Sequence, residues 1–564
     1  LKRWRNRLMW FDVLLALVAL ACIGYMLGDF DDFIERAVVP TQWDMLFGVV
    51  LVVLVLEAAR RSTGWVMPLV AVTFLAYALF GQHLPSPWTH RGYDVERLVG
   101  HMYMTLEGIF GTALDVSATL IILFTIYGAF LQQSGAGKFF IDFSFAATGG
   151  GSSSAGRTIV LSSFLLGGPS GSGVATTVTL GSVAYPILAK AGYDKDSAGG
   201  LLAAGGLGAI LSPPVLGAAA FLIAEFLKIS YMDVILMATI PTLLYYLSLF
   251  LMVELDSRRF GMHGVTFEAS AGVRELTRRY GFHFISLIAI IVFMLLGFSP
   301  MGSVFWATVV AFATSFLNKE CAITPKKLVT ALEGGSVGML NVGATCACAG
   351  LIVGVVTLTG LGLKFSDIVI AYAGSSLPLT ALYTALIVWV VGLAVPVTAS
   401  YIICAVIAAP ALIKLGVPDY AAHMFIFYYA VLSEVSPPTA LSPFAAAAIT
   451  GGNPYRTTMQ SWKYTLPAFV VPFMFVLDPA GLGLLLKGSW EDIALSSVTA
   501  MIGIAALAAG AQNWALRRCN PVERWLLIAA GLLLVYPKPL FDAVGVGLTL
   551  AVLAMQKLRK EAAS

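Results

Sequence analysis

The stretch Pro186-Ile-Leu-Ala-Lys-Ala-Gly192, followed by Ser212-Pro213-Pro214, occurs a second time as Pro410-Ala-Leu-Ile-Lys-Leu-Gly416, followed by Ser436-Pro437-Pro438. Both elements return after 224 residues, so no residue is gained or lost between them. Upstream, Leu106-Glu-Gly108 returns as Leu332-Glu-Gly334 after 226 residues. Self-similarity at a fixed offset indicates a duplicated structural unit. The chain therefore contains two copies of roughly 155 residues, about 97–253 and 325–477.

The composition places both copies in a membrane. Of the 564 residues, 59% are hydrophobic and 12% are charged, and the mean hydropathy is +0.86. A soluble globular chain carries about 25% charged residues. Apolar runs near the roughly 20 residues that a helix needs to cross a bilayer recur along the chain. Backbone amides in lipid must be satisfied within their own segment, so we expect an all-α polytopic membrane protein.

The positions of the basic residues predict the orientation of the two copies. Lys2, Arg3, Arg5 and Arg7 precede the first apolar run, five arginines lie in the loop 256–282, and further basic residues lie near Lys326 and after Lys557. By the positive-inside rule these segments are cytoplasmic, and so are both termini of this multi-pass protein of the bacterial inner membrane. Copy one then begins after an outside loop and copy two after an inside segment. Inverted repeats of this kind are typical of secondary transporters.

Each copy interrupts its apolar pattern twice. The interruptions are Gly167–Gly173 and Ser212–Pro214 in copy one, and Gly392–Ser400 and Ser436–Pro438 in copy two. Glycine and proline in mid-membrane break helices, and the freed backbone groups are tolerated only around a cavity or a bound ion. Carbonyl and hydroxyl oxygens suit a hard cation such as sodium. We expect sodium ligands among Ser172, Gly173, Thr176, Gly208, Ser212, Pro213, Thr398, Ser400, Ser436 and Pro437.

The same interruptions expose the N-terminal ends of half-helices. Their unpaired amides carry partial positive charge and favour anions, so a substrate carboxylate is expected there. The residues predicted to bind substrate are Ser170, Gly171, Ser172, Thr177, Thr398 and Ser400.

These motifs resemble the membrane component of tripartite ATP-independent periplasmic (TRAP) transporters, in the fused small-plus-large form (4TM/12TM type) that works with TAXI-type binding proteins. The resemblance is carried by residues 167–177, 205–217, 392–401 and 433–443. It implies small-subunit-like helices over 1–95 and a large-subunit-like region over 96–480, which leaves 481–564 as additional C-terminal helices. It also implies an elevator mechanism, two re-entrant hairpins with sodium at their tips, and a periplasmic TAXI-type binding protein. The implied substrates are small organic acids of the dicarboxylate, 2-oxoglutarate or glutamate class.

Glu434 departs from the symmetry of the repeat, because its counterpart in copy one is Ile210. A carboxylate in a membrane-embedded segment is a functional candidate. Burial favours the neutral form of a carboxyl group, so Glu434 could carry a proton. Proton coupling through Glu434 therefore stands as the alternative to sodium coupling, and an organic anion transporter that needs no binding protein is a second alternative.

Other classes fit the sequence less well. Gly168-Pro169-Ser170-Gly171 matches the pattern around the serine of intramembrane proteases, but no histidine is placed by a companion motif. Ser134-Gly-Ala-Gly-Lys138 lacks the spacing of a phosphate-binding loop, and no ATP-binding signature occurs. Nothing resembles a channel selectivity filter. We therefore expect a transporter that is not an enzyme, uses no ATP, binds no nucleic acid and has membrane lipid as its surroundings.

Overall fold

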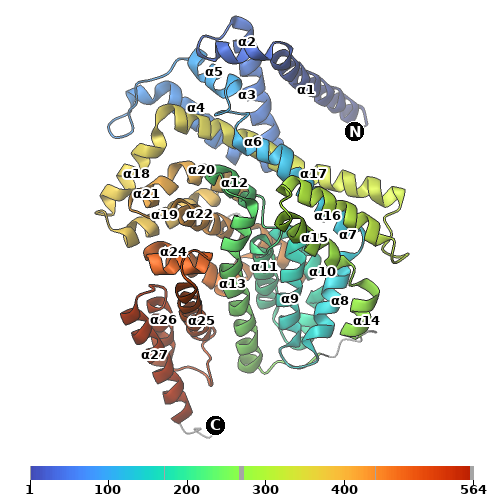
Figure 1. Cartoon of the computed structure of the whole chain (residues 1–564), viewed down its shortest axis with the longest axis vertical. Helices are drawn as coiled ribbons and strands as arrows, with labels where there is room; N and C mark the ends of the chain where they lie inside the picture. Colours follow the sequence, from blue (N-terminus) through green and yellow to red (C-terminus); the bar gives the residue numbers. More distant parts are fainter. Residues whose placement is uncertain (1, 171, 266–271, 438–439, 559–564) are drawn as a thin grey trace.

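The protein is described by a computed structural model that covers residues 2–170, 172–265, 272–437 and 440–558, with the side chains of 2–9 and 168–170 excluded (Figure 1). Within these ranges the chain is all-helical, which confirms the predicted fold class. Ten of the described helices are long and apolar enough to cross a membrane, or eleven if the pair Val273–Tyr280 and His283–Leu295, bent by 66°, is one span.

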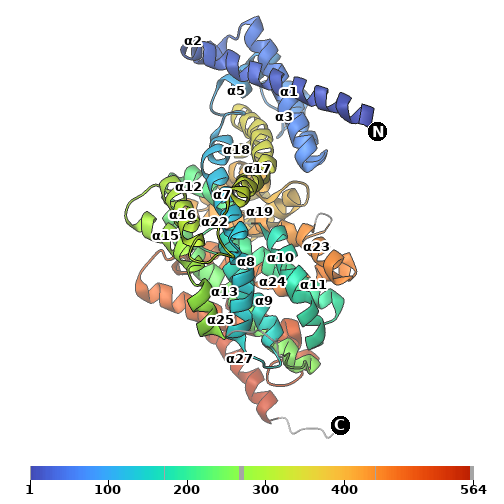
Figure 2. The same cartoon turned by 90° about the vertical axis from the view of Figure 1, so that its right-hand side faces the viewer.

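The N-terminal helices lie at one end of the molecule, and the C-terminal helix lies at the other (Figure 2). Three of the N-terminal helices are apolar and long enough to span a membrane. The elements are α1 (Lys2–Gly28), α2 (Phe30–Glu35), η1 (Arg36–Val38), α3 (Gln42–Thr63), α4 (Val66–Phe80) and η2 (Gly81–His83).

The order of helices in copy one recurs in copy two. Copy one consists of α5 (Val95–Met104), α6 (Thr112–Val116), η3 (Ser117–Ile121), α7 (Ile122–Gln133), α8 (Ala136–Thr148), α9 (Ser154–Ser170), α10 (Gly173–Ala191), α11 (Lys195–Leu211), α12 (Ala219–Leu227) and α13 (Tyr231–Phe260). Copy two consists of α17 (Pro325–Thr359), α18 (Leu361–Tyr372), α19 (Leu377–Gly392), α20 (Val397–Ile407), α21 (Ala409–Lys414), α22 (Asp419–Leu432), η4 (Ser433–Val435), α23 (Leu441–Thr450) and α24 (Pro454–Leu477). The copies are joined by α14 (Val273–Tyr280), α15 (His283–Leu295) and α16 (Pro300–Ser315).

In each copy the first interruption lies at the tip of a helical hairpin. The start of α9 packs beside the end of α10. A Cβ atom built on Gly156 of α9 would lie 2.6 Å from the hydroxyl oxygen of Tyr193, which follows α10. In copy two, α19 packs against α20 and α21, and the Ser400 hydroxyl donates to the Val388 carbonyl at 3.4 Å. The chain thus reverses at both tips, as the predicted hairpins require.

In each copy the second interruption divides a pair of half-helices, α11–α12 and α22–α23, which run in opposite directions. The start of α11 meets the end of α23, where the Asn453 amide donates to Asp196 at 2.7 Å. At the other end, Phe226 of α12 lies 6.4 Å from His423 of α22, measured between ring centroids. The two copies are therefore inverted relative to one another in space, in agreement with the orientation predicted from their charges.

The C-terminal elements η5 (Pro479–Leu485), α25 (Trp490–Gln512), α26 (Pro521–Leu533) and α27 (Pro539–Leu558) extend from the side of α13 and α24. The buried Asp256 carboxylate of α13 fixes α25, because it accepts hydrogen bonds from the Tyr464 hydroxyl and, at 3.1 Å, from the Gln512 amide. Lys463 lies 3.9 Å from the other oxygen of Asp256. With 13 residues, α26 is shorter than a membrane span, whereas α25 and α27 are long and apolar enough to cross a membrane.

Candidate functional site

The tip of hairpin one, formed by α9 and α10, packs directly against the second interruption of its own copy. A Cβ added to Gly167 would lie 2.8 Å from the Cβ of Ser212 and 2.9 Å from the Cα of Ala209. Only glycine allows so close an approach of two backbones. The Ser212 hydroxyl donates to the Gly208 carbonyl at 2.8 Å and lies 2.9 Å from the Tyr246 hydroxyl. A hydroxyl has one donor and two acceptor positions, so Ser212 keeps one lone pair for a further partner.

The corresponding junction in copy two lies between hairpin two, formed by α19 and α20, and the interruption after α22. A Cβ on Gly392 would lie 2.7 Å from the Ser433 hydroxyl and 3.2 Å from the Ser400 hydroxyl. Here two indoles donate to groups in the interruption: Trp389 to the Ser436 hydroxyl at 2.8 Å, and Trp462 to the Val435 carbonyl at 3.0 Å. The Ser436 hydroxyl donates to the Leu432 carbonyl at 2.9 Å, as Ser212 does to Gly208, so the two junctions differ mainly in having indole donors in copy two and a tyrosine in copy one.

Glu434 links the two copies. Its Oε1 atom accepts a hydrogen bond from the Ser442 hydroxyl at 2.6 Å, and its carboxylate also accepts one from the Val174 amide in the first turn of α10. A Cβ on Gly173 would lie only 3.0 Å from the carboxyl carbon of Glu434. The carboxyl group of Glu434 therefore lies at the N-terminal end of the 19-residue helix α10. The interruption in copy two thus touches the hairpin tip of copy one.

Next to hairpin one is a cavity of about 210 Å³. Its lining includes four threonines, Thr176 and Thr179 of α10, Thr125 of α7 and Thr330 of α17. Hydroxyl groups line it, and no group of three or more His, Cys, Asp or Glu side chains that could hold a metal ion occurs anywhere in the described ranges. Any cation held near these interruptions would be bound by hydroxyl and carbonyl oxygens, with Glu434 as the nearby carboxylate.

A family model described as "Tripartite ATP-independent periplasmic transporter, DctM component" matches residues 50–480. The chain belongs to the DctM family. It is accordingly the membrane component of a TRAP-type secondary transporter of organic acids, which works with a periplasmic substrate-binding protein, and the family is one of transporters rather than enzymes. Since the match begins at residue 50, the boundary at residue 95 between small-subunit-like and large-subunit-like parts stays a prediction.

Among solved structures, the DctM component is similar to the transporter YdaH of Alcanivorax borkumensis, whose crystal structure is described as having an unusual topology. The two chains share 15% sequence identity with a TM-score of 0.45 over 76% of this chain and 98% of that one. No curated protein matches the sequence.

The predicted site residues of the DctM component are only partly brought together. Thr176 lines the cavity beside hairpin one, whereas the neighbouring Thr177 faces α11 and donates to the Leu202 carbonyl at 3.4 Å. Ser172 is exposed at the start of α10, where its hydroxyl accepts from the Ala175 amide at 3.4 Å. The Gly208 carbonyl accepts the hydrogen bond from Ser212, and a Cβ on Gly208 would lie 2.7 Å from the Tyr246 hydroxyl oxygen. Gly208 therefore belongs to the junction around Ser212, whereas Thr177 bonds to α11.

The remaining predicted residues occupy less defined positions. Gly171 lies outside the described residues, and so does the side chain of Ser170. Thr398 is half-buried in the first turn of α20, and Pro213 and Pro437 are half-buried directly after their buried serines.

The sequence did not identify several groups that complete the site. Tyr246, Trp389, Trp462 and Ser442 all donate to or share hydrogen bonds with the interruptions. A polar aromatic residue in an apolar run is the available signal, because a buried indole or phenol needs a hydrogen-bond partner. That signal does not identify the partner.

Proposed function

We propose that this TRAP component imports small organic acids of the dicarboxylate, 2-oxoglutarate or glutamate class, driven by a sodium gradient and supplied by a periplasmic TAXI-type binding protein. The observation that carries the proposal is the convergence of interrupted helices from two inverted copies, with Gly167 against Ser212, Gly392 against Ser433, and Glu434 against Gly173. Such a junction offers oxygen ligands and helix ends at one place, as a coupled carrier requires.

Sodium coupling is supported by the oxygen chemistry of the two junctions. Ser212 keeps an acceptor position after its hydrogen bonds with Gly208 and Tyr246. Ser400 and Ser433 lie beside the same glycine of hairpin two. A monovalent cation could bind such neutral oxygens without an additional buried charge.

Proton coupling is the second candidate, and the position of Glu434 favours it. Its carboxylate is held by the Ser442 hydroxyl and by an amide from the opposite copy, so addition of a proton would weaken the contact between the copies. A carboxyl group placed between two moving parts can couple its proton to their separation.

An elevator motion, in which the two hairpins and their half-helices move against α7 and α17, agrees with this arrangement. The cavity of about 210 Å³ lies between those two sets of helices. With both termini in the cytoplasm, hairpin one opens inward and hairpin two outward.

The test is uptake of labelled 2-oxoglutarate and related acids into proteoliposomes, with the cognate binding protein present or absent and a sodium or a proton gradient imposed separately. Uptake that requires sodium and the binding protein is expected. Uptake driven by protons alone would transfer the coupling role to Glu434, and uptake indifferent to the binding protein would refute the tripartite reading.

A further inference from the structure

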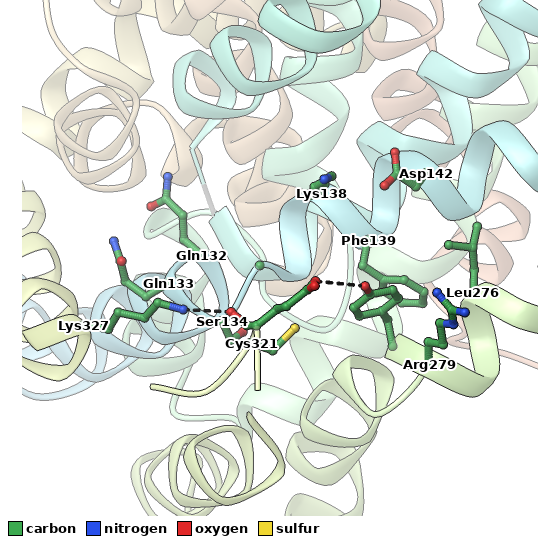
Figure 3. Close-up of a pocket in the computed structure, with 13 residues that line it drawn as sticks. Gln132, Gln133, Ser134, Lys138, Phe139, Asp142, Leu276, Arg279, Cys321 and Lys327 are labelled. Carbon is green, nitrogen blue, oxygen red and sulfur yellow. Dashed lines mark hydrogen bonds between the residues drawn. The ribbon is translucent and has the colours of Figure 1, made fainter. Parts of the chain in front are cut away.

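A second and larger cavity, of about 400 Å³, lies where three separate segments meet (Figure 3). They are the α7–α8 junction from Gln132 to Asp142, one face of α14 with Arg279 and Tyr280, and the approach to α17 from Glu320 to Lys327. Its volume falls in the range of roughly 300–1,000 Å³ that is usual for small-molecule sites. The loop 256–282 and the segment near Lys326, which the sequence placed on the same side of the membrane, thus meet around one cavity.

The walls of this cavity carry more positive than negative charge. Its three cationic side chains are Lys138, Arg279 and Lys327, against the two carboxylates Asp142 and Glu320. Figure 3 places Lys327 and Arg279 on opposite sides, with Lys138 between them in this view.

Of the three cations, Arg279 and Lys138 have carboxylate partners, Glu275 and Asp142, whereas Lys327 forms no ion pair with any residue that the structure describes. The Lys327 ammonium donates to the backbone carbonyl of Glu320 at 3.0 Å, which carries no net charge. The Glu320 carboxylate accepts from the Tyr280 hydroxyl at 3.2 Å. Arg279 pairs at 2.8 Å with Glu275, which does not line the cavity, and this exposed ion pair is weak. A cleft whose walls carry a net positive charge raises the local concentration of anions.

The charged cavity adjoins the cavity beside hairpin one, because Gln132 and Gln133 line both. The two glutamines therefore stand between the hydroxyl groups of Thr176 and Thr179 on one side and Lys327 on the other. An anion that leaves hairpin one would meet first hydroxyls, then amides, then cations.

We propose that the larger cavity is an exit vestibule for the transported organic anion, in which Lys138, Arg279 and Lys327 attract the carboxylate without binding it tightly. This inference rests on the proposed function, since it assigns the substrate of hairpin one to the vestibule. Asp142 and Glu320 weaken the hold on the anion and so permit release. The continuity with hairpin one favours the substrate over a lipid phosphate as the occupant.

Cys321 lines the vestibule and serves as a probe of its potential. The test compares the rates at which a negatively charged sulfonatoethyl and a positively charged trimethylammonioethyl methanethiosulfonate modify Cys321 in the full chain, with the product read by peptide mass spectrometry. Removal of one cation that lines the same cavity is expected to lower the ratio of anionic to cationic rates about two- to sixfold. The variants are Lys327→Gln and Arg279→Gln, and the matched controls are the sequence neighbours Lys326→Gln and Arg278→Gln, which do not line the cavity.

A second measurement uses labelled 2-oxoglutarate in inverted membrane vesicles, which present the vestibule to the medium. The KM of the two vestibule variants is expected to rise about two- to sixfold and to depend less on ionic strength. Equal behaviour of variants and controls in the thiol assay would overturn the proposal. A shift in rates that appears only in vesicles of anionic phospholipid would assign the vestibule to lipid instead. Absence of transport by the unaltered chain, with the thiol ratios shifted as expected, would refute the proposed function and leave the charged vestibule standing.

Discussion

The substitution Gly173→Ala tests the contact between the two copies most directly. The added methyl group would lie 3.0 Å from the carboxyl carbon of Glu434 and 3.1 Å from the carbonyl oxygen of Gly206, whereas carbon atoms pack at roughly 3.5–4.0 Å. Either the overlap remains, at a cost of about 1–3 kcal/mol, or Glu434 withdraws and loses a charge-assisted hydrogen bond of about 1.5–3 kcal/mol. Gly173 is the first residue of α10, so the preference of a helix interior for alanine does not offset this cost, and the destabilisation is about 1–3 kcal/mol.

Gly547→Ala is the matched control, because nothing lies within 4 Å of the position of its added methyl group in α27. This variant is expected to gain about 0.5–1 kcal/mol, so the two substitutions have opposite signs. The assay is the midpoint of thermal unfolding in detergent, followed by tryptophan fluorescence, together with the initial rate of uptake. Shortening the carboxylate in the double variant Gly173→Ala with Glu434→Asp is expected to recover part of the loss. Equal midpoints for the two glycine variants, with no recovery in the double variant, would refute the close approach of Glu434 to α10.

Three further substitutions test other parts of the structure. Glu434→Gln is expected to leave sodium-driven uptake measurable and to abolish any proton-driven uptake; loss of the sodium-driven component alone would contradict the hydroxyl and carbonyl sites. Trp389→Phe removes the indole donor to the interruption in copy two and is expected to cost about 0.5–1.5 kcal/mol in thermal unfolding, while the exposed Trp43→Phe costs nothing measurable. Asp256→Ala leaves its buried partners unpaired, so we expect the free energy of unfolding to fall by about 3–5 kcal/mol and the loop after α25 to be cleaved faster by protease. Asp233→Ala is the control, because the ion pair of Asp233 is exposed. Equal proteolysis of the two variants would show that Asp256 does not hold α25.

The sequence predicted the interruptions because their chemistry is local. Ser-Pro-Pro and the glycine-rich tip break helices wherever they occur, and the repeat located both pairs. It also singled out Glu434, since a carboxylate in an apolar region is conspicuous. The sequence could not predict whether Thr176 or Thr177 lines the cavity. Adjacent residues of a helix face directions about 100° apart, and only the packing of α10 decides which one faces the cavity.

Identical residues can also take different structures in the two copies. Leu332-Glu-Gly334 lies inside the continuous 35-residue helix α17, whereas Leu106-Glu-Gly108 lies in the loop between α5 and α6. That loop is closed by a hydrogen bond from the Ile109 amide to the Met102 carbonyl at 2.9 Å. Both α5 and α17 pack against α3, so contact with this helix does not distinguish the two copies. The difference lies in the loop itself, which interrupts the helix in copy one and has no counterpart in α17.

The contact of Glu434 with the first turn of α10 has a consequence for how such a protein can arise. A gene that encoded a single copy would have to build the same junction between two identical chains, related by a two-fold axis in the membrane plane. Such a dimer would place two carboxylates at symmetric positions, or none. Fusion of the copies removes that constraint, so that one copy carries Glu434 while the other carries Ile210. A single carboxyl group at one of two equivalent positions is thus a property that only the fused chain can have. Exchange of the two residues, with Ile210→Glu and Glu434→Ile, would show by the uptake that remains how far the two halves have become specialised.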